Sequence, residues 1–299
     1  MNQSPSPAPD PMNNTPDLMD NPQLILTKAV QCHQQGKLDE AEPLYHHYLK
    51  DVPGHAEAHH FLGILYHQKG KNAQAVEPMQ KAIALKGTVV AFRSNLANVL
   101  LALGRNEEAE AVCRQAILIA PANASAYFAL GQALKNLGRL EEAEAAYRQA
   151  ITLKGDYHQA HCNLGGLLKE MGKLEESEQA YRRAIQSKPD FAEAHFNLAN
   201  GLQESGRLEE AEAAYRQAIA FTPNFAPAHS NLGNSLHALK RWDEAAAAYR
   251  QAIRLQPNFV EAHSNLGSAL RELGKLEEAE ASCRRAIEIN PTHVNSHFN

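Results

Sequence analysis

The chain has 299 residues, a formal net charge of −5 and a pI near 6.3. Hydrophobic residues make up 44% of it and charged residues 21%, which is the composition of a soluble protein. The acidic balance argues against nucleic acid as a partner, because domains that bind nucleic acid are usually basic. No apolar run approaches the roughly 18 residues that span a bilayer, so we expect no membrane partner either.

Residues 1–21 form the first predicted segment, a disordered tail. Five prolines lie between Pro5 and Pro16, and the segment lacks the basic start and apolar stretch of a secretory signal. The chain also contains four cysteines without the spacing of metal or redox motifs: Cys32, Cys113, Cys162 and Cys283. We expect them to be small buried hydrophobes in a reducing compartment. These features predict a cytoplasmic protein without a cofactor or metal site.

From residue 22 onward, a pattern of 34 residues recurs eight times. The copies span residues 22–55, 56–89, 90–123, 124–157, 158–191, 192–225, 226–259 and 260–293, and residues 294–299 match the start of a ninth. Such a period indicates a solenoid, in which each unit buries its apolar face only by stacking on its neighbours. We therefore expect one continuous core without an internal boundary. The interrupted ninth copy suggests a fragment of a longer protein.

Each copy predicts two helices. Positions 1–14 form helix A, and an apolar pattern at positions 20, 24 and 27 predicts a helix B that ends near position 32. Glycine occupies position 15 in seven copies, with Lys240 in the other, and favours the left-handed turn that ends a helix. Small residues at positions 8 and 20 should let the two helices approach closely. Asp190 with Glu193, and Asn258 with Glu261, predict capping boxes at two of the A helices.

These positions together resemble the tetratricopeptide repeat: Leu at 7, Gly or Ala at 8, Gly at 15, Ala at 20, Tyr at 24, Ala at 27 and Pro at 32. The resemblance covers residues 22–293. It implies an all-α fold, a right-handed α-solenoid of eight helix-turn-helix repeats plus the start of a ninth. It also implies that the A helices line a concave, protein-binding groove. Two departures are histidine in place of the family's frequent tryptophan at position 4, and Lys28 in place of leucine at position 7 of the first copy.

Asparagine recurs on the side of helix A opposite the packed positions 4, 7, 8 and 11. Because asparagine is a poor residue for a helix interior, local propensity does not explain this recurrence. It either persists passively from recent duplication, or it forms a ladder of carboxamides that hold the C=O and N–H groups of an extended peptide. The candidate peptide-binding residues are Asn95, Asn163, Asn197, Asn231 and Asn265 at position 6, and Asn98, Asn200 and Asn234 at position 9.

The ladder resembles the superhelical repeat domain of O-linked N-acetylglucosamine transferase and its bacterial relatives. That resemblance implies that the position-6 asparagines hold a substrate backbone, with Ala129 interrupting the row. It covers only the repeat half of such an enzyme, since the chain contains no glycosyltransferase domain. Three functions therefore stay open. The chain is a protein–protein interaction module for extended peptide, the substrate-recognition half of a longer transferase, or a scaffold that self-associates through its last repeat.

Histidine occupies position 4 in six copies: His59, His161, His195, His229, His263 and His297. Copies of one position lie a whole repeat apart and cannot share a metal ion, so we expect these rings to pack between adjacent repeats. An adventitious site at His55, His59 and His60 is the less favoured alternative. The charged residues of helix B are expected on a solvated surface. Nothing resembles a phosphate loop, nucleophile elbow or HExxH motif, so we expect no enzyme within these residues.

Overall fold

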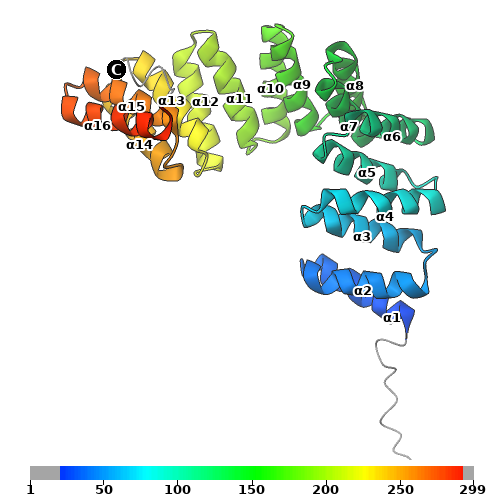
Figure 1. Ribbon diagram of the computed structural model, residues 1–299. Helices are drawn as coiled ribbons and strands as arrows, with labels where there is room; N and C mark the ends of the chain where they lie inside the picture. The colour runs from blue at the N-terminus through cyan, green and yellow to red at the C-terminus, as the bar shows by residue number, and fades with distance from the viewer. Residues whose placement is uncertain (1–20, 292–299) are drawn as a thin grey trace, which may run out of the picture. The chain divides into compact units, whose positions relative to one another are not determined.

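The computed structural model describes residues 21–291, which contain sixteen α-helices and no strand (Figure 1). The A helices are α1 (Pro22–Gln34), α3 (Ala56–Gln68), α5 (Val90–Ala102), α7 (Ala124–Asn136), α9 (His158–Glu170), α11 (Ala192–Glu204), α13 (Ala226–Ala238) and α15 (Val260–Glu272). The B helices are α2 (Leu38–Asp51), α4 (Asn72–Leu85), α6 (Asn106–Ile119), α8 (Leu140–Leu153), α10 (Leu174–Ser187), α12 (Leu208–Phe221), α14 (Trp242–Leu255) and α16 (Leu276–Ile289). The all-α solenoid class is thus confirmed. Residues 1–20 of the predicted tail and the partial copy 294–299, with His297, lie outside the described residues.

The packing divides the chain into two compact units, one ending at Arg139 and the other beginning at Leu140. Within each unit, an A helix generally packs against helix B of its own repeat and helix B of the repeat before it. The buried apolar residues accordingly form several local clusters. The expectation of a single core without an internal boundary stays a prediction, and the helices pack mainly against near neighbours in the chain.

The turns inside the repeats confirm the role predicted for position 15. Glycine has φ between 70° and 76° at seven of these turns, and Lys240 adopts φ 60° at the other. At Gly206, the N–H groups of Gly206 and Arg207 donate to the carbonyls of Gln203 and Leu202 at 3.0 and 2.9 Å. These two bonds satisfy carbonyls that the end of helix α11 leaves without helical partners.

The two predicted capping boxes are wrong. Helices α11 and α15 begin one residue later than a capping box requires, so their N-cap residues are Phe191 and Phe259, without a side-chain cap. Side chains cap two other A helices, α1 through Asn21 and α7 through Asn123, whose Oδ1 accepts from the N–H of Ala126 at 2.9 Å. A half-buried phenylalanine takes the N-cap position of each helix, and Phe191 packs against the core of the second unit.

Helices A and B approach closely at position 8, as predicted. A Cβ atom added to Gly233 would lie 2.5 Å from the ring of Tyr249, and one added to Gly165 would lie 2.7 Å from the ring of Tyr181. Both rings are buried against these glycines. The tyrosine at position 24 is thereby held with its hydroxyl directed towards the polar residues of helix A.

Candidate functional site

In the unit that begins at Leu140, we call the side of the A helices that carries the asparagines of positions 6 and 9 the asparagine face. In the second unit, the Nδ2 group of Asn231 donates to Oδ1 of Asn200 at 2.9 Å. The buried Tyr215 donates its hydroxyl to the same oxygen at 2.6 Å. This Tyr–Asn–Asn network joins α13 to both helices of the preceding repeat.

The same network recurs one repeat further along. Asn265 donates to Oδ1 of Asn234 at 2.9 Å, and Tyr249 donates to that oxygen at 2.8 Å. Burial raises the pKa of Tyr249, so its hydroxyl stays protonated and able to donate at neutral pH. A carboxamide offers two N–H groups and an oxygen that accepts two bonds, so the asparagines of these networks have more bonding groups than the bonds named here use.

Two other asparagines find different partners in the preceding repeat. Asn197 donates to Sγ of Cys162 at 3.6 Å, and Nδ2 of Asn95 lies 2.9 Å from Nε2 of His60. The partner in both cases occupies position 5 of the repeat before. Position 9 of those repeats is Gly166 and Ile64, which offer no side-chain oxygen, so the carboxamide turns to the neighbouring position.

The remaining candidates are Asn163 and Asn98. Asn163 is half-buried. Burial raises the pKa of Tyr147, and a hydrogen bond with Asn163 partly opposes that rise. Asn98 is exposed, and the next repeat has the buried Ala129 at position 6, whose methyl group cannot bond to a carboxamide. The eight asparagines therefore occupy unequal environments, and the two complete networks lie between α11 and α15.

The tyrosines that bond to the asparagines are not evident from the asparagine pattern alone. The sequence pattern places a tyrosine at position 24 of helix B, and Tyr215 and Tyr249 each follow the position-9 asparagine of their own repeat by 15 residues and donate to it. The position-6 asparagines are half-buried because they bond to the adjacent repeat. The recurrence of asparagine thus has a structural cause within the described residues.

A small polar hollow of about 170 Å³ opens on the asparagine face at the second network. Asn234, Asn265, Tyr249, Ser268 and His237 line it. Among the described atoms, Nε2 of His237 is buried without a hydrogen-bond partner. The hollow therefore combines carboxamide groups with a ring nitrogen that can donate or accept.

The position-4 histidines lie between adjacent repeats and have a definite bonding role. Nε2 of His195 lies 2.8 Å from the carbonyl oxygen of Pro189, and Nε2 of His263 lies 3.0 Å from that of Pro257. His59, His161 and His229 make the same bond to the residue six positions earlier. This hydrogen bond ties the turn after helix B to the next helix A. In residues 21–291, no group of three or more histidine, cysteine or acidic residues has the arrangement of a metal site.

Charged residues of the B helices form ion pairs across the repeat junctions. Arg207 contacts Glu178 at 2.7 Å and Glu210 at 2.6 Å, and Arg182 contacts the same carboxylates at 2.8 and 3.7 Å. The four side chains close a ring of alternating charge between α10 and α12. An equivalent ring contains Glu212, Arg216, Arg241 and Glu244. The surface expected to be merely solvated therefore also links neighbouring repeats.

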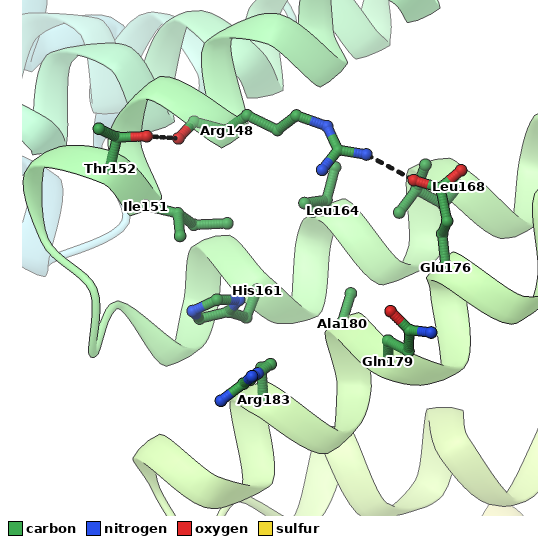
Figure 2. A pocket seen from close by; sticks show the side chains of 10 residues that line it. All are labelled: Arg148, Ile151, Thr152, His161, Leu164, Leu168, Glu176, Gln179, Ala180 and Arg183. Atoms are coloured by element: carbon green, nitrogen blue, oxygen red, sulfur yellow. Dashed lines mark hydrogen bonds and ion pairs between the residues drawn. The ribbon is translucent and has the colours of Figure 1, made fainter.

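Hollows lie between successive B helices, with an A helix as their floor. Figure 2 shows the hollow between α8, α9 and α10, which has a volume of about 360 Å³. Arg148 extends to Glu176 at 2.7 Å along one edge, and His161 and Arg183 lie towards the other. Hollows of about 480 and 690 Å³ occupy the same place between α2 and α4, and between α14 and α16.

The comparisons with known proteins agree with this architecture. Tetratricopeptide repeat models match residues 34–88 and 230–294, residues 97–138, 167–206 and 200–240, and residues 124–157. Among curated proteins, no significant relative was found. Within the described part of the chain, no helix is both long and apolar enough to cross a membrane.

Several solved structures share the fold. The Pseudomonas aeruginosa pilF structure has a TM-score of 0.64 at 18% identity, covering 71% of this chain and 98% of that one. YrrB, described as a TPR protein with an unusual peptide-binding site, has a TM-score of 0.56 at 20% identity, covering 62% and 96%. The APC/C Cut9–Hcn1 structure has a TM-score of 0.62 at 15% identity, and this chain covers 56% of its length.

At these identities, the structural likeness establishes the fold alone. The family models add the repeat identity, and they match most of the eight copies in the sequence. Repeats of this kind are protein-interaction and scaffold units. The chain belongs to the tetratricopeptide repeat family.

Proposed function

We propose that the chain is a protein–protein interaction module that binds an extended polypeptide along its asparagine face, the concave side in the family. The observation that carries the proposal is the pair of Tyr–Asn–Asn networks centred on Asn200 and Asn234. Each network fixes two carboxamides in orientation before any ligand arrives. A ligand backbone would therefore meet ordered donors and acceptors, which lowers the entropy lost on binding.

The spacing of the repeats suits a main-chain ligand. Packed helices lie roughly 10 Å apart, whereas an extended peptide rises about 3.3 Å per residue. One carboxamide pair per repeat would therefore reach about every third peptide residue. Such contacts make little demand on ligand side chains, and the hollow beside His237 supplies a place where one polar side chain could add selectivity.

The test compares variants of the full chain for binding to a peptide partner identified with the unmodified protein. Replacing Asn231 and Asn265 with alanine should weaken binding by about 1–3 kcal/mol, because each lost hydrogen bond contributes about 0.5–1.5 kcal/mol. Asn258→Ala is the matched control, since this exposed asparagine lies in a turn away from the face. Calorimetry gives the affinities, and circular dichroism checks that each variant is folded. Unchanged affinity of the folded double variant would refute the proposal.

The other functions expected from the sequence stay predictions. A transferase would use the same face to capture its polypeptide substrate, with a glycosyltransferase domain outside this chain. Its test is whether the gene encodes such a domain beyond Asn299. Self-association as a scaffold is tested by sedimentation of the chain over a dilution series.

The proposal keeps the cytoplasm as the location. Its support is the set of four cysteines, which are free and buried. Burial raises the pKa of Cys113 and Cys162 to about 12. These two thiols are therefore protonated and unreactive at neutral pH, as expected of small packing residues.

A further inference from the structure

The hollow between α14 and α16 differs from the others in its chemistry. Its volume is about 690 Å³, and its apolar lining includes Ala247, Ile253, Leu266 and Ala281. Leu266 is buried in the floor, whereas the two alanines are exposed on opposite walls. Small side chains on both walls therefore leave room for an apolar group to reach the leucine.

The charged residues that line this hollow are arginines. Arg250 and Arg254 project from α14 and Arg285 from α16, and no carboxylate belongs to the described lining. Arg250 pairs with Glu278 at 2.8 Å and Arg285 with Glu288 at 2.9 Å, both outside the lining. By contrast, Glu176 lines the hollow of Figure 2.

The remaining polar group of the floor is already engaged. Nε2 of His263 bonds to the carbonyl of Pro257 at 3.0 Å, as in the other repeats. His263 therefore forms part of the buried floor, and the three arginines make the hollow favour a negatively charged ligand. A guanidinium group can bind a carboxylate through two parallel hydrogen bonds.

We infer that the hollow between α14 and α16 is a second binding site, which takes an acidic peptide segment carrying an apolar side chain between carboxylates. The apolar side chain packs on Leu266 between the two alanines, and the carboxylates pair with Arg254 and Arg285. The site uses positions 4 and 7 of helix α15, whereas the asparagine face uses positions 6 and 9. The two sites are therefore separate, and one protein can engage two different segments.

The experiment titrates the full chain with a fluorescein-labelled dodecapeptide in which leucines alternate with pairs of glutamates. Two further peptides replace all glutamates with glutamine or all leucines with serine. We expect the first peptide to bind, its affinity to fall with rising salt, and each altered peptide to bind at least about tenfold more weakly, which corresponds to 1.4 kcal/mol. If the glutamine peptide binds as tightly as the first peptide, the inference is overturned. This test needs no variant of the protein.

Variants of the protein locate the site. Replacing Arg254 and Arg285 with alanine should weaken binding at least about tenfold, since hydrogen bonds to charged groups are among the stronger ones. Ala281→Leu should also abolish most binding because it fills the hollow from an exposed position. Arg284→Ala is the matched control: it lies next to Arg285, is 70% exposed, and is outside the lining.

The outcomes separate this inference from the proposed function. Asn231→Ala with Asn265→Ala should leave binding of the acidic peptide unchanged, whereas the arginine variants should leave the ligand of the asparagine face unaffected. Binding that survives both the double arginine variant and Ala281→Leu would overturn the inference. If the unmodified chain forms a dimer and Ala281→Leu dissociates that dimer, a second copy of the chain occupies the hollow. This outcome would also overturn the inference.

Discussion

At the scale of single residues, Lys240 occupies a backbone conformation that glycine occupies at the equivalent turns. Its φ is 60°, and its N–H donates to the carbonyl of His237 at 2.9 Å. The turn therefore has the same hydrogen bonding as the glycine turns, but with a side chain in the left-handed region. That conformation brings Cβ close to the following carbonyl oxygen.

We expect Lys240→Gly to stabilise the protein by about 1 kcal/mol, because glycine adopts this conformation without the steric cost. Lys240→Ala keeps a Cβ atom and should have little effect, which makes it the control for loss of the charged side chain. Urea unfolding followed by circular dichroism measures both free energies. If glycine and alanine behave alike, the backbone at Lys240 is not strained.

At the scale of elements, the asparagine networks connect helices that belong to different repeats. Asn265 on α15 reaches Asn234 on α13, whose Oδ1 also accepts from Tyr249 on α14. The network is consequently part of the interface between repeats as well as part of the proposed binding face. Substitutions here should affect both stability and binding.

Tyr249→Phe and Asn265→Ala should each reduce the free energy of unfolding by about 0.5–1.5 kcal/mol, the usual net value of a hydrogen bond. Both residues bond to one oxygen of Asn234, so the double variant should show a coupling energy of at least about 0.5 kcal/mol. A double-mutant cycle from chemical unfolding measures this energy. Strict additivity would mean that the three groups do not act as one network.

The ion-pair rings between B helices predict a pH dependence. Burial acts to raise the pKa of Glu178, but hydrogen bonds from Arg182 and Arg207 outweigh it and lower the pKa below its ordinary 4.5. A carboxylate with a lowered pKa in the folded state stabilises the fold above its unfolded pKa. That stabilisation is lost as the pH falls through the folded-state pKa.

Glu178→Gln should therefore lose less stability than the unmodified chain when the pH falls from about 5 to about 3. The glutamine variant cannot gain a proton at this position, so its contribution does not titrate. Thermal melts at a series of pH values follow the difference, with the exposed Glu209→Gln as the control. Parallel pH profiles for the unmodified and Glu178→Gln chains would contradict the role of the ring.

At the scale of the whole molecule, stability arises from contacts between neighbours in the chain. Each of the two units has buried clusters of its own, and the unit that begins at Leu140 contains both asparagine networks and the hollow between α14 and α16. In repeat proteins, stability is approximately a sum of terms within repeats and between adjacent repeats.

We expect residues 140–299 alone to fold into helices and to unfold cooperatively, because their packing is supplied within that unit. Far-UV circular dichroism and urea unfolding test this outcome. The shortened chain should also bind the acidic dodecapeptide with the affinity of the full chain. An unfolded segment would show that its stability depends on the residues before it.

The sequence by itself determined the 34-residue period, the helix pairs, the left-handed turns at position 15 and the close approach at position 8. Each of these depends on residues within one repeat, so a local pattern is enough to predict it. Helix capping was predicted wrongly at Asp190 and Asn258, because the helices begin one residue later and place Phe191 and Phe259 at the N-cap.

Only the tertiary structure decided what the asparagines do. Asn197 bonds to Cys162, whereas Asn231 bonds to Asn200, because position 9 of the preceding repeat is glycine in one case and asparagine in the other. Only the tertiary structure shows the ion-pair rings and the hollows between B helices as well, because their residues come from adjacent repeats. Such sites depend on side chains some thirty residues apart that meet only when the repeats stack, and a pattern within one repeat does not contain that information.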